Sequence, residues 1–327
     1  MSWLAGKRVY VAGHRGLAGS AILRALQARG LGPVVTRTHA EVDLEDAAQA
    51  RALLLQERPQ VVFLAAAKVG GILANNTYPV DFLLRNLLIE ANVIRAAHEA
   101  GVERLVFLGS SCIYPREAPV PISESALLTG PLEATNRPYA LAKIAGIELC
   151  WAYNRQHGTR FLAAMPTNLY GPGDSYDPQN SHALPALIRK VHEAKVDGHG
   201  EVVLWGSGKP RREFLFSDDL ADALLFLAGL DDARFAALTD PAQCPLINVG
   251  TGEDIEVGEL AALIADVLGW RGRFVHDLSK PDGTMRKVMD VSRLQALGWR
   301  ASTPLRTGLA AAYGDYKQQA GVAATLP

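Results

Sequence analysis

The chain has 327 residues, enough for one large domain or two ordinary ones, with a globular composition of 49% hydrophobic and 20% charged residues. Its formal net charge of −1 lacks the basic excess of a general nucleic-acid-binding protein, and no apolar run approaches the ~18 residues of a membrane span. The cysteines Cys112, Cys150 and Cys244 are widely spaced and form no CxxC pair, so we expect no disulfide framework, no metal site and a reducing, cytoplasmic compartment.

A strand, a glycine turn and a helix open the chain. Residues 8–12 have strand character, Gly13, Gly16 and Gly19 follow with the spacing GxxGxxG, and residues 20–26 carry an apolar helix face. Glycines allow a tight turn and close approach of a pyrophosphate, whose charge a helix N-terminus favours. A purely structural turn is the alternative, but the flanking strand and helix favour a dinucleotide site.

The second strand, at residues 33–36, bears on which cofactor binds. An acidic residue here would bind the ribose 2′-hydroxyl of NAD. This chain instead has Arg37, with His39 close by and Arg15 in the glycine turn, which favours the 2′-phosphate of NADP over a merely solvated arginine. Asp43 either meets the adenine edge or caps the helix that begins near Asp46.

Strands and helices alternate through the next 130 residues. The apolar runs 61–67, 104–108 and 160–165 predict buried strands, and helices are expected over 81–100 and from 139 onward. This alternation predicts an α/β fold with a Rossmann-type doubly wound parallel sheet. We assign residues 1–170 to a cofactor domain and 171–327 mainly to a smaller α/β substrate domain, with chain crossovers between them. In the second part, strands are expected at 202–206 and 246–249, and helices at 184–194 and 257–268.

The candidate chemistry lies after the strand at 104–108. Ser110 and Cys112 follow it at the carboxyl edge of the sheet, where ligands bind in open α/β folds. Tyr139 and Lys143 are four residues apart and share one helix face, although any helix can contain such a pair. A lysine ammonium lowers the pKa of a neighbouring phenol, which can then exchange a proton with a carbonyl oxygen that Ser110 holds. This is the chemistry of ketone reduction or alcohol oxidation.

These motifs resemble the extended short-chain dehydrogenase/reductase family along nearly the whole chain. Within it, six further segments are most similar to the GDP-L-fucose synthases: 13–16, 65–71, 75–79, 109–115, 180–182 and 280–283. The resemblance implies that GDP-4-keto-6-deoxy-D-mannose is epimerised at C3 and C5 and then reduced at C4 by NADPH. It also implies a homodimer that pairs through helices, for which 81–100 and 139–153 are the candidates.

The resemblance also assigns roles to individual residues. It implies that Ser110, Tyr139 and Lys143 serve the ketone oxygen, that Cys112 is the epimerisation base, and that His182 is the acid opposite it. The alternatives are a small buried hydrophobe for Cys112 and a helix cap or surface group for His182. Residues implied to contact the GDP-sugar are Lys190, Trp205, Arg212 and, more weakly, Asp282. Cofactor contacts are expected at Gly13, Arg15, Gly16, Leu17, Gly19, Arg37, His39, Asp43, Leu64, Ala65, Leu108, Gly109, Ser110, Tyr139, Lys143, Pro166, Asn168, Leu169 and His182.

Two rival functions remain open at this point. A nucleotide-sugar 4-epimerase or dehydratase of the same family would recycle NAD, and a dehydratase usually needs a carboxylic acid near the position where this chain has Cys112. A non-catalytic dinucleotide sensor would not need Tyr139 and Lys143, yet both are present. His39 is neutral above pH ~6.5, so the preference for NADP is expected to depend mainly on Arg15 and Arg37.

Overall fold

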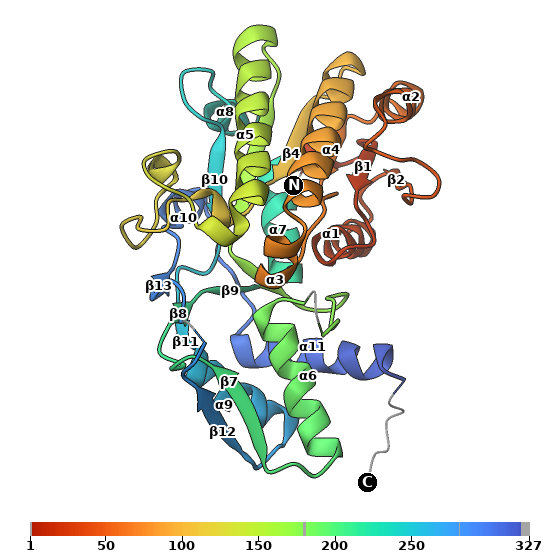
Figure 1. The fold of residues 1–327 in the computed structure, drawn as a ribbon. Helices are drawn as coiled ribbons and strands as arrows, with labels where there is room; N and C mark the ends of the chain where they lie inside the picture. The colour runs from red at the N-terminus through yellow and green to blue at the C-terminus, as the bar shows by residue number, and fades with distance from the viewer. Residues whose placement is uncertain (1, 179–180, 281, 322–327) are drawn as a thin grey trace.

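Six parallel strands form the sheet that positions the site, in the upper part of Figure 1. The structure is a computed structural model that describes residues 2–178, 181–280 and 282–321, so Asn180 and Pro281 of the segments named above lie outside the described residues. In spatial order the strands are β10 (Leu246–Val249), β5 (Phe161–Pro166), β4 (Arg104–Leu108), β3 (Val61–Leu64), β1 (Val9–Ala12) and β2 (Val34–Val35).

Helices cover both faces of this sheet, as the continuous apolar strands require. In β3, Val62 and Leu64 pack into one core, while Val61 and Phe63 pack into the core on the opposite face, because successive side chains alternate. One face carries α2 (Ala47–Glu57), α4 (Pro79–Glu99) and α5 (Arg137–His157); the other carries α1 (Leu17–Ala28), α7 (Ser217–Ala228) and α8 (Asp232–Leu238). This arrangement confirms the predicted Rossmann-type doubly wound fold.

A second body lies below the sheet in Figure 1 and has its own apolar core. Its larger elements are α6 (Ala183–Val196), β7 (Glu201–Trp205), α9 (Val257–Leu268), β12 (Arg273–Asp277) and α11 (Leu305–Gln319). The shorter elements are η2 (Ser111–Ile113), α3 (Ile72–Thr77), β6 (Asn168–Tyr170), β8 (Arg211–Arg212), β9 (Phe214–Phe216), β11 (Ile255–Glu256), β13 (Arg286–Lys287) and α10 (Ser292–Ala296). Three further 3-10 turns are η1 (Ser2–Leu4), η3 (Glu124–Ala126) and η4 (Ala134–Asn136).

The chain passes between the bodies more than once. After α6 and β7 it returns to the sheet, where α7 packs against α1 and β10 pairs with β5. The buried carboxylate of Glu213 fixes one of these crossings, because it accepts hydrogen bonds from the backbone amides of Gly252 and Met289, both at 2.8 Å. The cofactor edge of the sheet is therefore held directly against the second body.

Several predicted elements are confirmed with their bounds, among them β4, β10 and α9. The helix that contains Tyr139 begins at Arg137, two residues earlier than predicted, and ends at His157. Residues 168–170 lie beyond the predicted strand at 160–165 and form a separate strand, β6, because they pair in parallel with β9. Such a pairing across 45 residues leaves no local signature.

Candidate active site

The glycine turn after β1 has the shape of a dinucleotide cradle. Gly13 has φ +82°, and a Cβ there would lie 2.6 Å from the backbone nitrogen of Ala66, at the end of β3. A Cβ on Gly19 would lie 2.1 Å from the carbonyl oxygen of Gly13. Only glycine fits these two positions, and α1 begins at Leu17 behind Gly16 with no side chain capping it. The free helix start and the bare backbone fit a pyrophosphate.

Arg37 lies at the end of β2 with its guanidinium already held. It pairs with the carboxylate of Glu57 and donates to the carbonyl oxygen of Thr36 at 2.8 Å. The positive charges of Arg37 and Arg15 both act on Glu41, whose pKa is lowered chiefly by hydrogen bonds from Thr38. The two arginines therefore share one electrostatic neighbourhood beside the glycine turn, and no acidic residue occupies the end of β2.

Asp43 does not cap the following helix, so that alternative was wrong. The cap of α2 is Asp46, whose side chain accepts hydrogen bonds from the backbone amides of Ala48 and Gln49. Asp43 instead accepts from the backbone amide of Glu45 at 2.9 Å and lies 3.6 Å from Nδ1 of the exposed His39. A contact between Asp43 and the adenine edge stays a prediction.

The other expected cofactor residues come to the same edge of the sheet. They follow adjacent strands in spatial order, so that the carboxyl ends of β1, β3, β4 and β5 lie side by side. They are Leu64 and Ala65 after β3, Leu108 and Gly109 after β4, Pro166 at the end of β5, and Asn168 and Leu169 in β6. Gly109 is required for packing, since a Cβ there would lie 1.7 Å from Cε of Met165.

Ser110, Cys112 and Tyr139 meet at the carboxyl end of β4. The backbone amide of Cys112 donates to Oγ of Ser110 at 3.4 Å, which begins the short helix η2. The hydroxyl of Ser110 lies close enough to the phenol of Tyr139, which comes from the first turn of α5, to oppose the rise in its pKa. Phe82 of α4 packs edge-on against the Tyr139 ring, with 6.1 Å between the ring centroids. The three groups therefore face one another from two elements.

Lys143 differs from the expectation in its choice of partner. Its ammonium lies 3.0 Å from Oε1 of Glu90 and donates to the carbonyl oxygen of Leu108 at 2.9 Å. Burial raises the pKa of Tyr139 well above 10, and the negative charges of Cys112 and Glu90 raise it further. The expected lowering of this pKa was therefore wrong for the structure, because burial dominates, and the carboxylate of Glu90, which the sequence did not reveal, adds to the rise.

The thiol of Cys112 is buried, and burial raises its pKa. Three neighbours act in the opposite direction, led by the positive charge of Lys287 on β13, then the hydrogen bond with Ser110, then Lys143. Lys287 comes from a segment 175 residues further along the chain, and no local sequence pattern predicts its place beside Cys112. Its charge favours the thiolate that a base at this position requires.

His182 is the N-cap residue of α6, although its side chain makes no capping hydrogen bond. The ring is open to solvent, yet the protein that surrounds it lowers its pKa by desolvation. A cavity of about 620 Å³ lies nearby, between α3, the start of α4 and the loop at 175–177. Phe82 lines this cavity and also packs on Tyr139, so the cavity adjoins the phenol.

The expected substrate residues cluster in the second body. Trp205 is 65% exposed at the end of β7, and the ammonium groups of Lys190 and Lys280 lie 5.5 and 5.6 Å from its ring centroid. Arg212 is directly paired with Lys287 in the register of β8 and β13. An exposed indole with two ammonium groups close to its ring suits a nucleoside diphosphate. Lys280 belongs to the segment 280–283, but the sequence alone did not predict a role for this lysine.

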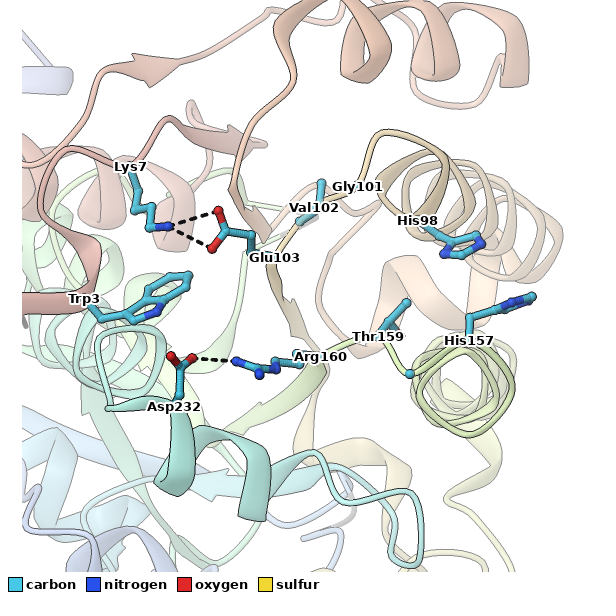
Figure 2. Close-up of a pocket in the computed structure, with 11 residues that line it drawn as sticks. Trp3, Lys7, His98, Gly101, Val102, Glu103, His157, Thr159, Arg160 and Asp232 are labelled. Atoms are coloured by element: carbon cyan, nitrogen blue, oxygen red, sulfur yellow. Dashed lines mark hydrogen bonds and ion pairs between the residues drawn. The ribbon is translucent and has the colours of Figure 1, made fainter.

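The cavity in Figure 2, of about 650 Å³, is not part of this site. It lies before β4 and β5, at the amino ends of the strands, and is lined by residues such as Val102 and Thr159. Its charges are paired with each other, Lys7 with Glu103 and Arg160 with Asp232. The candidate site lies at the opposite edge of the same sheet.

Two features are absent from the part of the chain that the structure describes. No group of three or more His, Cys, Asp or Glu side chains within residues 2–178, 181–280 and 282–321 is placed to hold a metal ion. Over the same ranges, no helix has the length and apolarity needed to cross a membrane.

Known proteins match this chain along nearly its full length. It is 55% identical to GDP-L-fucose synthase 1 of Arabidopsis thaliana over 94% of this chain and 93% of that protein. It is 53% identical to GDP-L-fucose synthase of Escherichia coli (strain K12), covering 94% and 95%. The structure of a GDP-L-fucose synthetase from Naegleria fowleri bound to NADP superposes with a TM-score of 0.85 at 27% identity, covering 98% and 96%. Residues 9–235 match the model of the NAD dependent epimerase/dehydratase family, and the chain belongs to this family.

Proposed function

We propose that this chain converts GDP-4-keto-6-deoxy-D-mannose to GDP-L-fucose, by epimerising C3 and C5 and then reducing the C4 ketone with NADPH. One observation carries the proposal: Ser110, Cys112 and Tyr139 meet beside the glycine cradle, so a proton donor, a candidate base and a cofactor site share one edge of the sheet. The plant and bacterial relatives named GDP-L-fucose synthase support the same substrate and product.

Epimerisation requires a base on one face of the sugar and an acid on the other. The thiolate of Cys112 takes the proton from C3 or C5, which the neighbouring ketone acidifies. Ser110 and Tyr139 donate hydrogen bonds to the C4 oxygen, on which negative charge develops. His182, open to solvent at the start of α6, returns a proton from the opposite face.

Reduction uses the same oxygen contacts. When bound, NADPH supplies the hydride that C4 accepts. Tyr139 gives its phenolic proton to the C4 oxygen while Ser110 holds that oxygen in place. Because burial and the charge of Glu90 raise the pKa of Tyr139, the phenol is protonated at neutral pH and ready to act as the acid. Lys143, one turn after Tyr139 on α5, is the third residue proposed to act with Ser110 and Tyr139 in the reduction.

The cofactor fits the residues at the sheet edge. Gly13, Gly16 and Gly19 leave room for the pyrophosphate, and Arg15 and Arg37 supply positive charge for the 2′-phosphate. Further contacts are proposed for His39 and Asp43 on the adenosine side and for His182 near the reacting ring. The residues of the strand ends complete the set: Leu17, Leu64, Ala65, Leu108, Gly109, Ser110, Tyr139, Lys143, Pro166, Asn168 and Leu169.

The second body is proposed to hold the nucleotide part of the substrate. Trp205 offers a face for the guanine base, and Lys190 and Arg212 offer charge for the diphosphate. In this proposal, residues 1–170 bind mainly the cofactor, and residues 171–327 bind mainly the substrate.

The decisive experiment combines NADPH oxidation with product identification. The chain is mixed with GDP-4-keto-6-deoxy-D-mannose and NADPH, and the product is identified by NMR. We expect stoichiometric oxidation of NADPH and GDP-L-fucose as the product. Conversion of a nucleotide sugar with a C4 hydroxyl into its C4 epimer, without net consumption of NADPH, would support the 4-epimerase instead. Binding of NADPH without any turnover would support the dinucleotide sensor.

We further propose a homodimer that pairs through α4 and α5, which pack side by side (Figure 1). Leu84 and Leu88 on α4 and Leu141 on α5 are 50%, 37% and 40% exposed, an unusual number of large apolar side chains for two adjacent helices. Light scattering should give twice the chain mass of 35.1 kDa, and Leu84→Glu should lower it. A monomeric wild type would disprove the pairing.

We also propose that the protein works in the cytoplasm. Cys112, Cys150 and Cys244 are all free thiols, as in proteins of a reducing compartment. Fractionation of the cells that make the protein would test this assignment.

A further inference from the structure

A buried carboxylate lies directly behind the candidate catalytic lysine. Oε1 of Glu90, on α4, is 3.0 Å from Nζ of Lys143, on α5, and both side chains are only 2% exposed. The carboxylate oxygens of Glu90 receive no aligned hydrogen bond from the described residues. Burial raises the pKa of Glu90, and its ion pair with Lys143 opposes this effect and favours the charged carboxylate.

The packing of α5 against α4 leaves space for this carboxylate. Residue 146, one turn after Lys143, is a glycine, and a Cβ there would lie 2.7 Å from Oε2 of Glu90 and 2.5 Å from Cζ of Phe107. Any larger residue would displace either the carboxylate or the ring. The ring of Phe107 in turn lies 4.7 Å from the ammonium of Lys143. The lysine is thus enclosed by a carboxylate, a carbonyl and an aromatic ring.

We infer that Glu90 is a positioning residue, which fixes the direction in which Lys143 presents its ammonium to the cofactor and to Tyr139. An ammonium has three N–H donors. The carbonyl oxygen of Leu108 takes one at 2.9 Å, and the carboxylate of Glu90 lies within reach of a second. The hydrogen bond to Leu108 and the charge of Glu90 together hold the ammonium in one place and limit the directions of its remaining N–H groups. This inference rests on the proposed reductase function.

Glu90 also sets the charge that Tyr139 experiences. The ionisable groups that face this pair are Tyr139 and Cys150 on α5 and Cys112 on η2, and Lys287 of β13 faces Cys112. Burial is the main cause that raises the pKa of Tyr139, the charge of Cys112 comes second, and the charge of Glu90 adds to both. Without Glu90, the phenol would lose its proton at lower pH, and reduction, which needs the phenolic proton, would stop earlier as the pH rises.

Glu90→Gln tests this inference, because it keeps the size of the side chain and removes its charge. We expect the alkaline limb of kcat/KM for C4 reduction to move down by about one pH unit or more. We also expect binding of NADPH, followed by fluorescence titration without substrate, to weaken about tenfold. Glu99→Gln is the matched control, since Glu99 is on the same helix but pairs with Arg51 and Arg95 at the surface. If Glu90→Gln lowered kcat/KM equally at every pH and left the alkaline limb where it is, the inference would be overturned.

Lys143→Met provides the second test and covers the case in which Glu90→Gln alone folds poorly. If Glu90 acts through the lysine, Glu90→Gln should leave the affinity for NADPH unchanged when it is added to Lys143→Met. It should also raise the Tm of that variant, because it removes a buried charge without a partner. A further tenfold loss of affinity in the double variant would overturn the inference. The affinity for NADPH and the Tm are measured without the sugar substrate. If the wild type failed to reduce the proposed ketone, that result would refute the proposed reductase function but would not bear on the role of Glu90.

Discussion

Asp282 holds Ser207 through both of its carboxylate oxygens. Oδ1 accepts from the backbone amide of Ser207 at 2.6 Å, and Oδ2 accepts from its hydroxyl at 2.8 Å. These hydrogen bonds lower the pKa of Asp282. Gly206 has φ +75°, and a Cβ there would lie 2.3 Å from Oδ1, so only glycine allows this approach. Asp282 therefore shapes the turn that follows Trp205.

Asp282→Ala should raise the KM for the GDP-sugar about tenfold, with a smaller change in kcat. The two lost hydrogen bonds contribute on the order of 1 kcal/mol each, and their loss frees the turn beside Trp205. Steady-state kinetics with saturating NADPH measures both constants. Ser207→Ala removes only the hydroxyl contact and should have a smaller effect. An unchanged KM in Asp282→Ala would show that this turn does not support substrate binding.

Tyr139→Phe should reduce the rate of C4 reduction by about 10²–10⁴ while NADPH still binds. The ring of phenylalanine keeps the edge-on contact with Phe82, and only the phenolic proton is lost. Single-turnover oxidation of NADPH measures the chemical step, and fluorescence titration measures the affinity for the cofactor. Near-normal turnover would remove Tyr139 from its role as the acid.

The sequence predicted those parts of the site that have local signatures. The GxxGxxG turn between a strand and a helix, and the four-residue spacing of Tyr139 and Lys143, both depend on neighbours in the chain. Side-chain alternation and apolar runs likewise predicted the sheet, whose strands are buried on both faces. Local patterns of this kind were sufficient for the fold and for the candidate acid.

The partners that adjust the chemistry could not be predicted in this way. Glu90 meets Lys143 only because α4 packs against α5, and Lys287 meets Cys112 only because β13 pairs with β8. Neither contact is visible in local sequence. The same limit applied to the shift in the pKa of Tyr139. Its direction depends on burial and on Glu90, and not on Lys143 alone.

Arg37→Ala should narrow the preference for NADPH over NADH by about ten- to a hundredfold. Glu57 and the carbonyl oxygen of Thr36 already hold the guanidinium, so little side-chain freedom is lost when a phosphate binds. The ratio of kcat/KM for the two cofactors is the measurement. Arg8→Ala is a useful control, because Arg8 pairs with the same Glu57 from another strand end. If the ratio does not move, Arg15 is the next candidate.

Lys287→Met should move the pH profile of epimerisation to higher pH. A thiol acts as a base only after it loses its proton, so exchange of the C3 and C5 protons should rise with pH in the wild type. The charge of Lys287 opposes the effect of burial on the pKa of Cys112, and its removal raises that pKa further. Deuterium exchange of the substrate in D₂O, followed by NMR across the alkaline range, measures the shift. A profile that moves to lower pH would contradict this sign.

Cys112→Ser should separate the two chemistries. A serine hydroxyl fills nearly the same buried space, yet it is far too weakly acidic to replace a thiolate as the base, so exchange of the C3 and C5 protons should slow sharply. Ser110 and Tyr139 still serve the C4 oxygen, so affinity for NADPH should change little and some unepimerised ketone should still be reduced. NMR should then identify a GDP-sugar other than GDP-L-fucose, which would show that different side chains carry the two reactions. Exchange at the wild-type rate would mean that Cys112 only packs, and that His182 or another group is the base.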